Sequence, residues 1–520
     1  MVTLPRQEYI RLKAEARFYR AQHERSAKRE AELKQKIEKY KAQIRDLRQR
    51  YFGRRSEKCA AGSEQEGQCS ARRRGVRGQR QGSRGHGRTP LPHLPVVAQE
   101  VDLAEENKRC PKCAAPLLEC GLTQDSETLE IQVQAHIRRV KRKRYRPSCA
   151  CGVLPGIVTA PAAARLIPKG RLGISVWIEV LLQKYHYCQP TSRLLQSWAS
   201  LGLKVSPGTI IGGLKQLMAL FVPLMQAFKA QQLHDDFFHA DETLWRVFEN
   251  IADKVGYRWY LWVFRSRAVC FYILDPSRAA CVPLSHFAQL LSEAIVVCDR
   301  YSAYKKMART LGILLAYCWA HLRRDFLELG RGYPPLAPWA NQWVERIGTL
   351  YHCNELRLKA PPDTRGQAHA KLVEHVEQMA AGLAQGLADP QLHPAARKVL
   401  LSLQKHWSGL TLFVTRPEIP MDNNAAERAL RNPVCGRKNY FGSGAKWAGE
   451  FAAMMFTALM TVVHCWQINP RLWLTEYLRA CAENGGRAPA DLSAFLPWAM
   501  PPQRLAFLRG PAPAAAIDSS

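Results

Sequence analysis

Acidic residues are scarce in this sequence of 520 residues: 44 aspartates and glutamates stand against 75 lysines and arginines, which gives a net charge of +31. An excess of that size indicates an anionic partner, with nucleic acid as the first candidate and a membrane surface as the second. The sequence also lacks an apolar run of the ~20 residues that a membrane-spanning helix needs. Its first residues do not form an apolar signal segment either. We therefore expect a cytoplasmic protein with no membrane partner.

A disulfide framework and a nucleotide-binding loop are also missing. Most of the 16 cysteines are scattered, and several, such as Cys270 and Cys298, lie inside apolar runs, where reduced cysteine acts as a small core residue. No strand is predicted before Gly442 and Gly444, and no Walker lysine follows them. Hydrophobic residues nevertheless make up 47% of the chain. The length and this content predict several domains with a large core.

The most informative stretch runs from Asp235 to Asp299. Short runs rich in aromatic and β-branched residues predict strands here, and one run with helical spacing of its apolar residues predicts a helix. In chain order we expect a strand at 237–238 that stops at 239–243, strands at 258–264 and 268–274, a helix at 283–291, and a strand at 294–298 that ends on Asp299. The predicted order is a three-stranded meander, a helix, and a strand that returns parallel.

Two carboxylates, Asp241 and Asp299, lie at or near the ends of these strands, so that alignment in one sheet would bring them together. This order of elements is ribonuclease-H-like, and it requires a third acid from a later helix. The best candidate is Glu427, one turn into a helix that Asp422 or Asn423 can cap. Three clustered carboxylates repel one another, and Mg²⁺ or Mn²⁺, which prefer oxygen ligands, would relieve that repulsion. Two such ions ~4 Å apart can activate an attacking oxygen and stabilise a leaving one on a phosphodiester.

Four short motifs carry a resemblance to a known family. They are His239-Ala-Asp-Glu-Thr243, Cys298-Asp-Arg-Tyr-Ser-Ala-Tyr304, Cys318-Trp-Ala-His-Leu-Arg-Arg324 and Asp422-Asn-Asn-Ala-Ala-Glu-Arg-Ala-Leu-Arg431. These motifs resemble the signature motifs of the insertion-sequence family number sixty-six, whose enzymes are DDE transposases. The resemblance covers most of the chain. It implies Asp241, Asp299 and Glu427 as the catalytic, metal-binding triad of an α/β, ribonuclease-H-like domain.

The activity that the resemblance implies is metal-dependent cleavage and strand transfer of DNA during transposition of an insertion sequence. Two alternatives remain: a nuclease of the same fold that cuts without joining, and a catalytically inactive DNA-binding regulator. The expected partners are double-stranded DNA, at the element ends and at the target, further copies of the chain in a homo-oligomer, and accessory proteins encoded by the same element. We expect a bacterial cytoplasmic protein that associates with the nucleoid when it is bound to DNA.

Shifts in composition along the chain predict its domain organisation. The expected regions are an N-terminal helix at 1–58, an arginine- and glycine-rich linker at 59–95, a zinc-ribbon-like module at 96–154, a helical region at 155–232, the catalytic domain at 233–460 with a helical insertion at about 332–416, and a C-terminal helical segment with a tail at 461–520.

Helical periodicity predicts two recognition elements outside the catalytic domain. Apolar residues recur with spacings of four and three at Leu33, Ile37, Tyr40, Ile44, Leu47 and Tyr51. This a/d pattern predicts a coiled coil and self-association; the alternative is a helix packed on its own domain. At 190–216, a helix, a short turn and a helix capped by Ser206 have the outline of a DNA-binding helix-turn-helix. The same outline is common in ordinary helical packing.

Two pairs of cysteines predict a zinc site, since four thiolates can hold one Zn²⁺ tetrahedrally. The expected ligands are Cys110, Cys113, Cys149 and Cys151. The second pair has one intervening residue instead of two, so Cys120 and His136 remain alternatives for the fourth ligand. Alternation at 131–137 predicts a strand within this module.

Basic residues expected to contact DNA phosphates fall into four groups. They are Arg72, Arg73 and Arg74 in the linker; Arg138, Arg139, Lys141, Arg142, Lys143 and Arg144 after the predicted strand; Arg323 and Arg324 after Cys318 and His321; and Arg431, Arg437 and Lys438 after Glu427. Cys318 and His321 could form a metal pair, but two ligands alone favour a packed cysteine and a hydrogen-bonded histidine.

Overall fold

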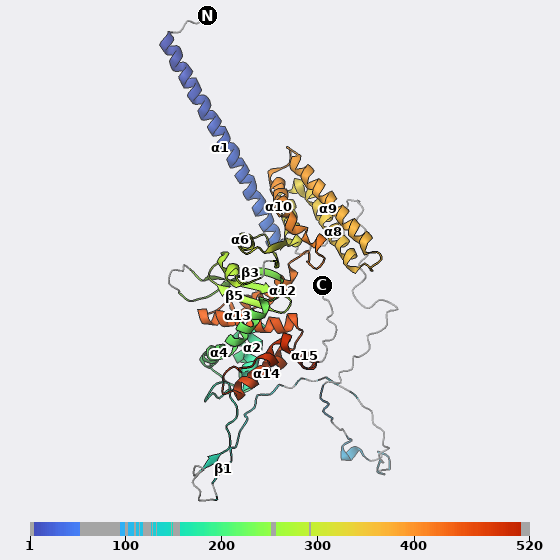
Figure 1. The fold of residues 1–520 in the computed structure, drawn as a ribbon. Helices are drawn as coiled ribbons and strands as arrows, with labels where there is room; N and C mark the ends of the chain where they lie inside the picture. The colour runs from blue at the N-terminus through green and yellow to red at the C-terminus, as the bar shows by residue number, and fades with distance from the viewer. Residues whose placement is uncertain are drawn as a thin grey trace.

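The protein is seen here as a computed structural model, which describes residues 5–52, 94–98, 102–108, 111–113, 115–117, 126, 128–129, 131, 133–146, 148, 157–250, 256–290 and 293–510. A five-stranded sheet lies at the centre, helices cover both of its faces, and one long helix projects away from the rest (Figure 1). The described part is therefore a mixed α/β protein in which helix predominates.

The helices are α1 (Arg6–Phe52), α2 (Ile174–Tyr185), α3 (Thr191–Ser200), α4 (Pro207–Gln232), α5 (Cys281–His286), α6 (Ser302–Leu311), α7 (Trp319–Gly332), α8 (Ala337–Lys359), α9 (Arg365–Ala388), α10 (Pro394–Leu410), α11 (Leu412–Thr415), α12 (Asn424–Tyr440), α13 (Lys446–Met460), α14 (Pro470–Glu483) and α15 (Pro502–Arg509). The strands are β1 (Arg144–Tyr145), β2 (Val158–Thr159), β3 (Phe237–Arg246), β4 (Arg258–Arg265), β5 (Cys270–Asp275), β6 (Ile295–Cys298) and β7 (Leu314–Tyr317).

The central sheet has the strand order β5-β4-β3-β6-β7. β3, β4 and β5 form an antiparallel meander, whereas β6 pairs parallel with both β3 and β7. The predicted meander with a parallel return is confirmed. Two predicted bounds are wrong: β3 does not stop at 239–243 but continues to Arg246, because β4 pairs with it from His239 onwards. The helix predicted at 283–291 ends at His286.

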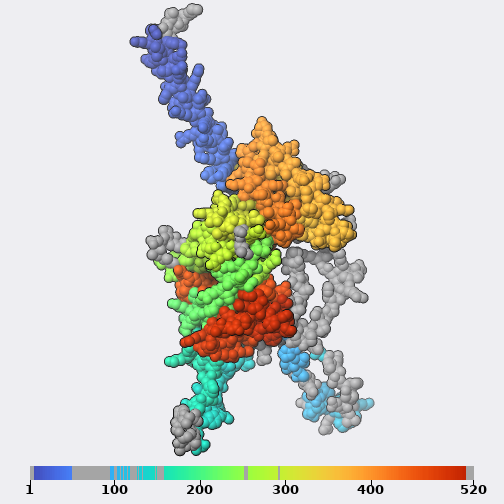
Figure 2. Space-filling model, viewed as in Figure 1, coloured from blue at the N-terminus to red at the C-terminus, as the bar shows by residue number. Residues whose placement is uncertain are grey.

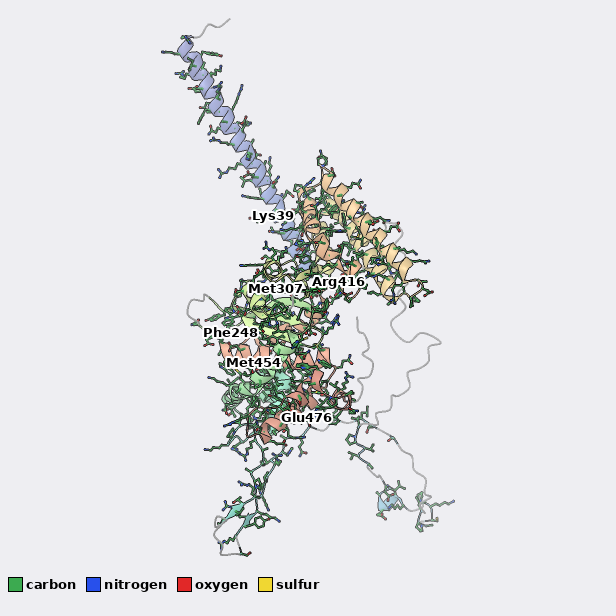
Figure 3. All side chains as sticks on the ribbon, in the orientation of Figure 1. Lys39, Phe248, Met307, Arg416, Met454 and Glu476 are labelled. Atoms are coloured by element: carbon green, nitrogen blue, oxygen red, sulfur yellow. The ribbon has the colours of Figure 1, made fainter. Side chains whose placement is uncertain are left out.

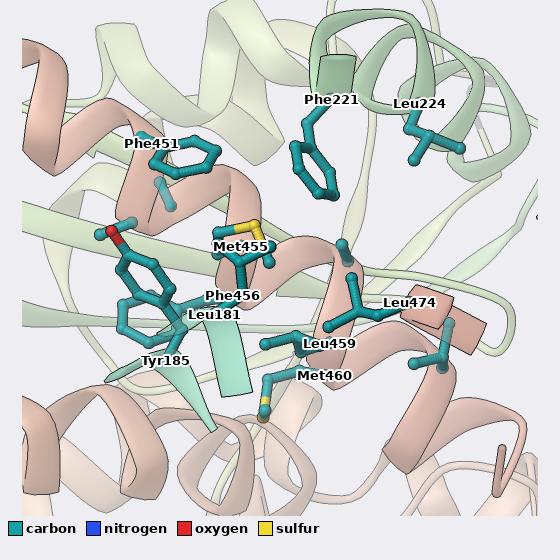
Figure 4. Close-up of a cluster of buried hydrophobic side chains, with 14 of the residues drawn as sticks. Leu181, Tyr185, Phe221, Leu224, Phe451, Met455, Phe456, Leu459, Met460 and Leu474 are labelled. Atoms are coloured by element: carbon teal, nitrogen blue, oxygen red, sulfur yellow. The ribbon is translucent and has the colours of Figure 1, made fainter. Parts of the chain in front are cut away.

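Alternation along the strands divides the apolar core between the two faces of the sheet. Val296 and Cys298 face one cluster with α5 and α6, while Ile295 and Val297 face another with α7, α8, α9 and α10. A third and larger cluster packs β4 and β5 against α2, α4, α13 and α14. Figure 4 shows its centre, where aromatic and aliphatic side chains from four helices interdigitate. Helices that precede β3 and helices that follow α12 in the sequence thus share one core.

Two helices in the described part are long and apolar enough to cross a membrane by length and composition alone, Pro207–Gln232 and Lys446–Cys465. Both contribute buried side chains to the core in Figure 4, including Phe221 from the first and Phe451 from the second. Burial inside the protein accounts for their apolar character, as for the core helix of a globular protein.

The long helix α1 meets the rest of the chain only near its C-terminal end within the described residues. Ala42 is buried there against Gly332 of α7, and the Arg45 Nε donates to the Gly332 carbonyl oxygen over 2.8 Å. The predicted a/d residues from Leu33 to Leu47 are instead 49–60% exposed. Figures 2 and 3 show the projecting helix and its side chains, Lys39 among them, spread around the axis. The helix is confirmed, and its pairing into a coiled coil stays a prediction.

The zinc-ribbon region is described only in part. Cys110, Cys149 and Cys151, like the alternative ligand Cys120, lie outside the described residues, as do Arg72, Arg73 and Arg74; Cys113 is exposed. The strand predicted at 131–137 does not form at the described positions 133–137. Residues 144–145 pair instead with Val158–Thr159 as a short antiparallel ladder. The zinc site stays a prediction.

Candidate active site

Asp241 and Asp299 come from neighbouring parallel strands of the sheet. β6 pairs with β3 in the register Phe237↔Ile295 to His239↔Val297. Extension of that register by two residues places Asp299 opposite Asp241. The register thus brings the backbone of the two acids to neighbouring positions, and their joint role stays a prediction. Asp241 lies in the middle of β3 rather than at its end, at the point where β6 stops and the edge of β3 opens.

Glu427 reaches the same place from the first turn of α12, which lies across β3. Two bonds fix the segment before this helix to the start of α7, and two more fix it to β3. The backbone N–H of Trp319 donates to the Met421 oxygen over 2.9 Å, and that of Asn423 donates to Cys318 Sγ over 3.3 Å. The Asn423 side chain accepts from His239 Nδ1 over 3.0 Å and donates to the Ala240 oxygen over 2.8 Å.

Two residues share the role of the predicted helix cap: one occupies the N-cap position and the other makes the capping bond. Asp422 Oδ1 accepts the N–H of Asn424 over 3.0 Å, which is the bond of a capping side chain. Asn423 occupies the N-cap position, but its side chain makes no cap bond because it is used to tie α12 to β3. On β4, Arg265 donates from Nη1 to the Ala425 oxygen over 3.2 Å and holds the first turn from the other side.

The pKa of Asp241 depends on the charges of the other two predicted acids. Burial, with smaller contributions from the charges of Glu242, Asp299 and Glu427, raises the pKa of Asp241 to about 8, against a hydrogen bond from the Glu242 N–H that lowers it. A carboxylate in this position is unstable as an anion without a nearby cation. The charges of both other predicted acids thus reach Asp241.

A second buried acid, Glu242, points to the opposite face of β3, and sequence reasoning missed its role. Its side chain is 2% exposed. Oε1 accepts from Arg278 Nε over 2.9 Å and from Nη2 over 2.6 Å, and Oε2 accepts from Tyr304 over 2.6 Å. The strand alternation after Asp241 is the signal that could have placed Glu242 on this other face.

Hydrogen bonds within the loop and to two helices hold the loop that carries Asp299. Asp299 Oδ1 accepts the N–H of Tyr301 over 2.9 Å. Arg300 donates from Nη2 to Asp325 over 2.6 Å and from Nη1 to Ser402 over 2.9 Å, and so ties the loop to α7 and to α10 of the helical insertion. The insertion therefore supports the position of the second acid.

Cys318 and His321 lie beside Glu427. One ligand atom from each of the three residues falls within 4.8 Å of the others, and His321 Nε2 is 4.0 Å from Glu427 Oε1. Burial raises the pKa of the Cys318 thiol, and its sulfur accepts the N–H of Asn423. Cys318 is thus packed, whereas His321 is too far from Glu427 for a hydrogen bond, and the three residues lie close enough together to hold a metal ion.

The predicted DNA-contacting residues differ in exposure and in their partners. Arg324, Arg431 and Lys438 are exposed, as are the basic residues from 138 to 144. Arg437 is instead directed at β3, where Nη1 donates to Thr243 Oγ1 over 3.1 Å and to the Leu244 oxygen. Arg323 lies near Tyr351 of α8, which is a further neighbour of Glu427 that the sequence did not indicate. DNA contact by these residues stays a prediction.

The donor set fits a hard divalent cation. Asp241, Asp299 and Glu427 offer only carboxylate oxygens, the ligands that Mg²⁺ and Mn²⁺ prefer. The raised pKa of buried Asp241 is the second sign of fit, because a bound cation would stabilise the anion that burial disfavours.

Several proteins are similar to this chain. The uncharacterized protein y4jD of Sinorhizobium fredii (strain NBRC 101917 / NGR234) is 27% identical over 446 residues, which cover 82% of this chain and 84% of y4jD. The uncharacterized protein y4hP of the same organism is 23% identical and covers 77% of this chain and 75% of its own length. A chain in the crystal structure of a pre-cleavage Mos1 transpososome matches 32% of this chain and 62% of its own length, with 12% identity and a TM-score of 0.14.

The family comparison covers the part of the chain in which the three acids and their supporting strands lie. The model of the transposase IS66 family matches residues 169–451, which is more than half of the sequence. This range contains Asp241, Asp299 and Glu427, together with the helical insertion between the second and third acids. The chain therefore belongs to the transposase IS66 family.

Proposed function

We propose that this protein is a DDE transposase that cleaves DNA at the ends of an insertion sequence and joins those ends to target DNA. The single observation that carries the proposal is that buried Asp241 on β3 responds to the charges of Asp299, after β6, and of Glu427, in the first turn of α12. Asp241, Asp299 and Glu427 are its catalytic residues.

Mg²⁺ or Mn²⁺, as a pair of ions held by these carboxylates, would activate the attacking oxygen and neutralise charge on the leaving oxygen of the phosphodiester. The side chains around the carboxylates have positioning roles. Asn423 and Arg265 fix the helix that carries Glu427, and Arg300 fixes the loop that carries Asp299. Water attacks in the cleavage step and a DNA 3′-hydroxyl in the joining step.

Double-stranded DNA is the proposed substrate, and its support is the distribution of charge. The net charge of +31 suits a polyanion. Arg138, Arg139, Lys141 and Lys143 are exposed just before β1, Arg144 is exposed at its start, and Arg142 donates to the Ala160 oxygen. These residues and those after Glu427 would hold the phosphate backbone in a sequence-independent way.

A homo-oligomer is part of the same proposal. The face of α1 that holds Ala42 is docked on α7, whereas the a/d residues are exposed. Because successive helix residues are 100° apart, Ala42 lies about 180° from that apolar seam. A second copy of α1 would bury the seam without displacing the contact with α7.

The experiment that tests the function is a cleavage and strand-transfer assay with purified protein and a labelled duplex of the element end, in Mg²⁺ and in EDTA. We expect nicking and joining in Mg²⁺ only. Glu427→Ala, Asp241→Ala and Asp299→Ala should each lower both products by at least 10³-fold, because each removes a carboxylate ligand, while DNA binding persists.

Glu418→Ala is the matched control, since Glu418 is exposed just before α12 and belongs to no part of the site. It should leave cleavage unchanged. Full cleavage by any of the three triad variants would refute the assignment of that residue. Nicking without joining would favour the nuclease alternative, and metal-independent binding without any product would favour a regulator.

A further inference from the structure

A pocket lies beside the site on the face of the sheet toward which Glu242 points. It is lined by Glu242, Thr243, Leu244, Arg258, Tyr260 and Arg278. Its volume of about 340 Å³ lies within the range of small-ligand sites. The pocket exists because β6 ends at Cys298 while β3 runs on to Arg246, so the second half of β3 has no strand on that side.

Arg258 of the pocket lining faces a second arginine, Arg246, which is not itself part of the lining. Arg246 of β3 is the direct cross-strand partner of Arg258 of β4 in their antiparallel register. Like charges directly opposite each other destabilise a sheet. Neither arginine forms an ion pair with an acid in the described part of the chain, and both are exposed. An unfavourable pair of this kind indicates a site that becomes favourable when an anion binds.

Arg278 completes the basic wall and is held before any ligand arrives. Nε and Nη2 bond the buried carboxylate of Glu242, and the guanidinium lies 4.2 Å from the centre of the Tyr301 ring. The Tyr301 hydroxyl donates to the Arg278 carbonyl oxygen over 2.8 Å. A planar guanidinium fixed at one edge suits recognition of a phosphate.

Tyr260 supplies an aromatic surface between these charges. It follows Arg258 by two residues on β4, so both side chains stand on the same face of the sheet. Aromatic rings next to phosphate-binding arginines are the usual combination for an unpaired nucleotide, whose base or sugar packs on the ring. The pocket therefore presents charge for a phosphate and a ring for the group attached to it.

We propose that this pocket binds an unpaired nucleotide of the DNA strand that passes the active site, with its phosphate between Arg258 and Arg278 and its base or sugar against Tyr260. Along β3 the pocket residues lie one to three positions beyond Asp241, at most about 10 Å at the rise of a strand. The pocket is on the opposite face from Asp241, so the DNA strand would pass around the edge of β3 that β6 leaves open. The proposal rests on DNA being the substrate, and it adds a site at which the strand is held open.

The test is photocrosslinking of the full-length protein to a duplex with a six-thymidine overhang in which one thymine is replaced by 5-iodouracil. EDTA prevents cleavage, so binding is read alone. We expect a crosslinked peptide that contains Tyr260. Arg258→Glu should reduce the yield of that peptide at least 10-fold, because it removes a phosphate contact and adds a repulsive charge.

Lys306→Glu is the control. Lys306 is exposed on α6, and its substitution makes the same change of charge outside the pocket. The yield of the crosslinked Tyr260 peptide from this variant should match that of the wild type. Thermal melting should show that both variants fold. The proposal is overturned if no crosslink falls on the peptide around Tyr260, or if Arg258→Glu and Lys306→Glu behave alike. A normal cleavage assay with a failed crosslink rejects the pocket alone, whereas a crosslink at Tyr260 in a protein that never cleaves rejects the transposase chemistry alone.

Discussion

Asn423 joins three parts of the site through one buried side chain. It is 1% exposed, and it bonds His239 and Ala240 of β3 while its own N–H donates to Cys318. Asn423→Ala would leave the His239 nitrogen and the Ala240 oxygen buried without these partners. Each such group costs about 1–3 kcal/mol. We expect a loss of about 2–4 kcal/mol in the free energy of unfolding, measured by urea denaturation.

Cleavage in this variant should fall more than DNA binding, because the glutamate helix loses its tie to β3. The control is Asn424→Ala, the next residue, whose side chain is exposed. A surface change of this kind should stay within about 0.5 kcal/mol of the wild type. Equal effects of the two substitutions would contradict the role given to Asn423.

His286 is a residue whose protonation should govern stability in mild acid. Its ring is buried, lies face to face with Phe264 at 4.6 Å, and bonds Gln232 through Nε2 over 2.8 Å. Burial lowers its pKa to about 3, with a smaller contribution from Lys229. The folded-state pKa is below the unfolded value, so the stabilisation is present above about pH 6.5 and is lost as pH falls toward 3.

The wild type should lose about 2 kcal/mol of stability between pH 7 and pH 5 through this group. His286→Gln keeps a donor for Gln232 but does not titrate, so its denaturation midpoint should fall less over the same interval. His352→Gln, on the exposed side of α8, is the control and should follow the wild type. Parallel pH profiles of His286→Gln and the wild type would argue against this account.

Two adjacent glycines show how closely helices α2 and α4 pack. A Cβ at Gly213 would overlap the ring of Trp177 on α2, whereas a Cβ at Gly212 would meet nothing. We expect Gly212→Ala to raise the melting temperature slightly, since alanine favours a helix over glycine by about 1 kcal/mol. Gly213→Ala should lower stability by about 1–3 kcal/mol, because the core must expand. Differential scanning calorimetry of the two variants compares these effects in one helix. A higher melting temperature for Gly213→Ala than for the wild type would contradict the close packing against Trp177.

At the scale of elements, apolar periodicity was sufficient to predict most of the central sheet. The parallel return of β6 and the register that aligns Asp299 with Asp241 follow from short runs bounded by turn residues. The true length of β3 could not be predicted, because residues 240–246 place three polar residues in a row and lack the alternation of a strand, and they become one only through pairing with β4. Long-range pairing of that kind has no local signal.

The candidate site was predictable in its acids but not in its supports. Asp241, Asp299 and Glu427 stand out as acids beside apolar runs, whereas the bonds of Arg278 to Glu242 and of Arg300 to Asp325 join residues far apart in sequence. Arg437 was expected at DNA and is directed at β3 instead. A sequence shows that a side chain is basic, but it does not show which way the side chain points. The partners of arginine and lysine are therefore known only once the fold is known.

At the scale of the whole molecule, self-association should depend on the exposed face of α1. Ile37→Glu combined with Ile44→Glu places charges in the apolar seam and should lower the mass measured by light scattering, because a coiled-coil interface cannot bury unpaired charges. Lys39→Glu with Gln43→Glu, on exposed positions outside the seam, should leave the mass unchanged. An oligomer that persists in the seam variant would show that another surface holds the copies together.

The contact of Ala42 with Gly332 has a consequence for how two copies would be spaced. Two chains paired along their seams would carry their folded bodies on the outer sides of the helix pair, because each body is attached to the face opposite the seam. Where the bodies flank the helices, about two helix diameters, or ~20 Å, would separate them. The thickness of the paired helices, and not a contact between the bodies, would then set that separation.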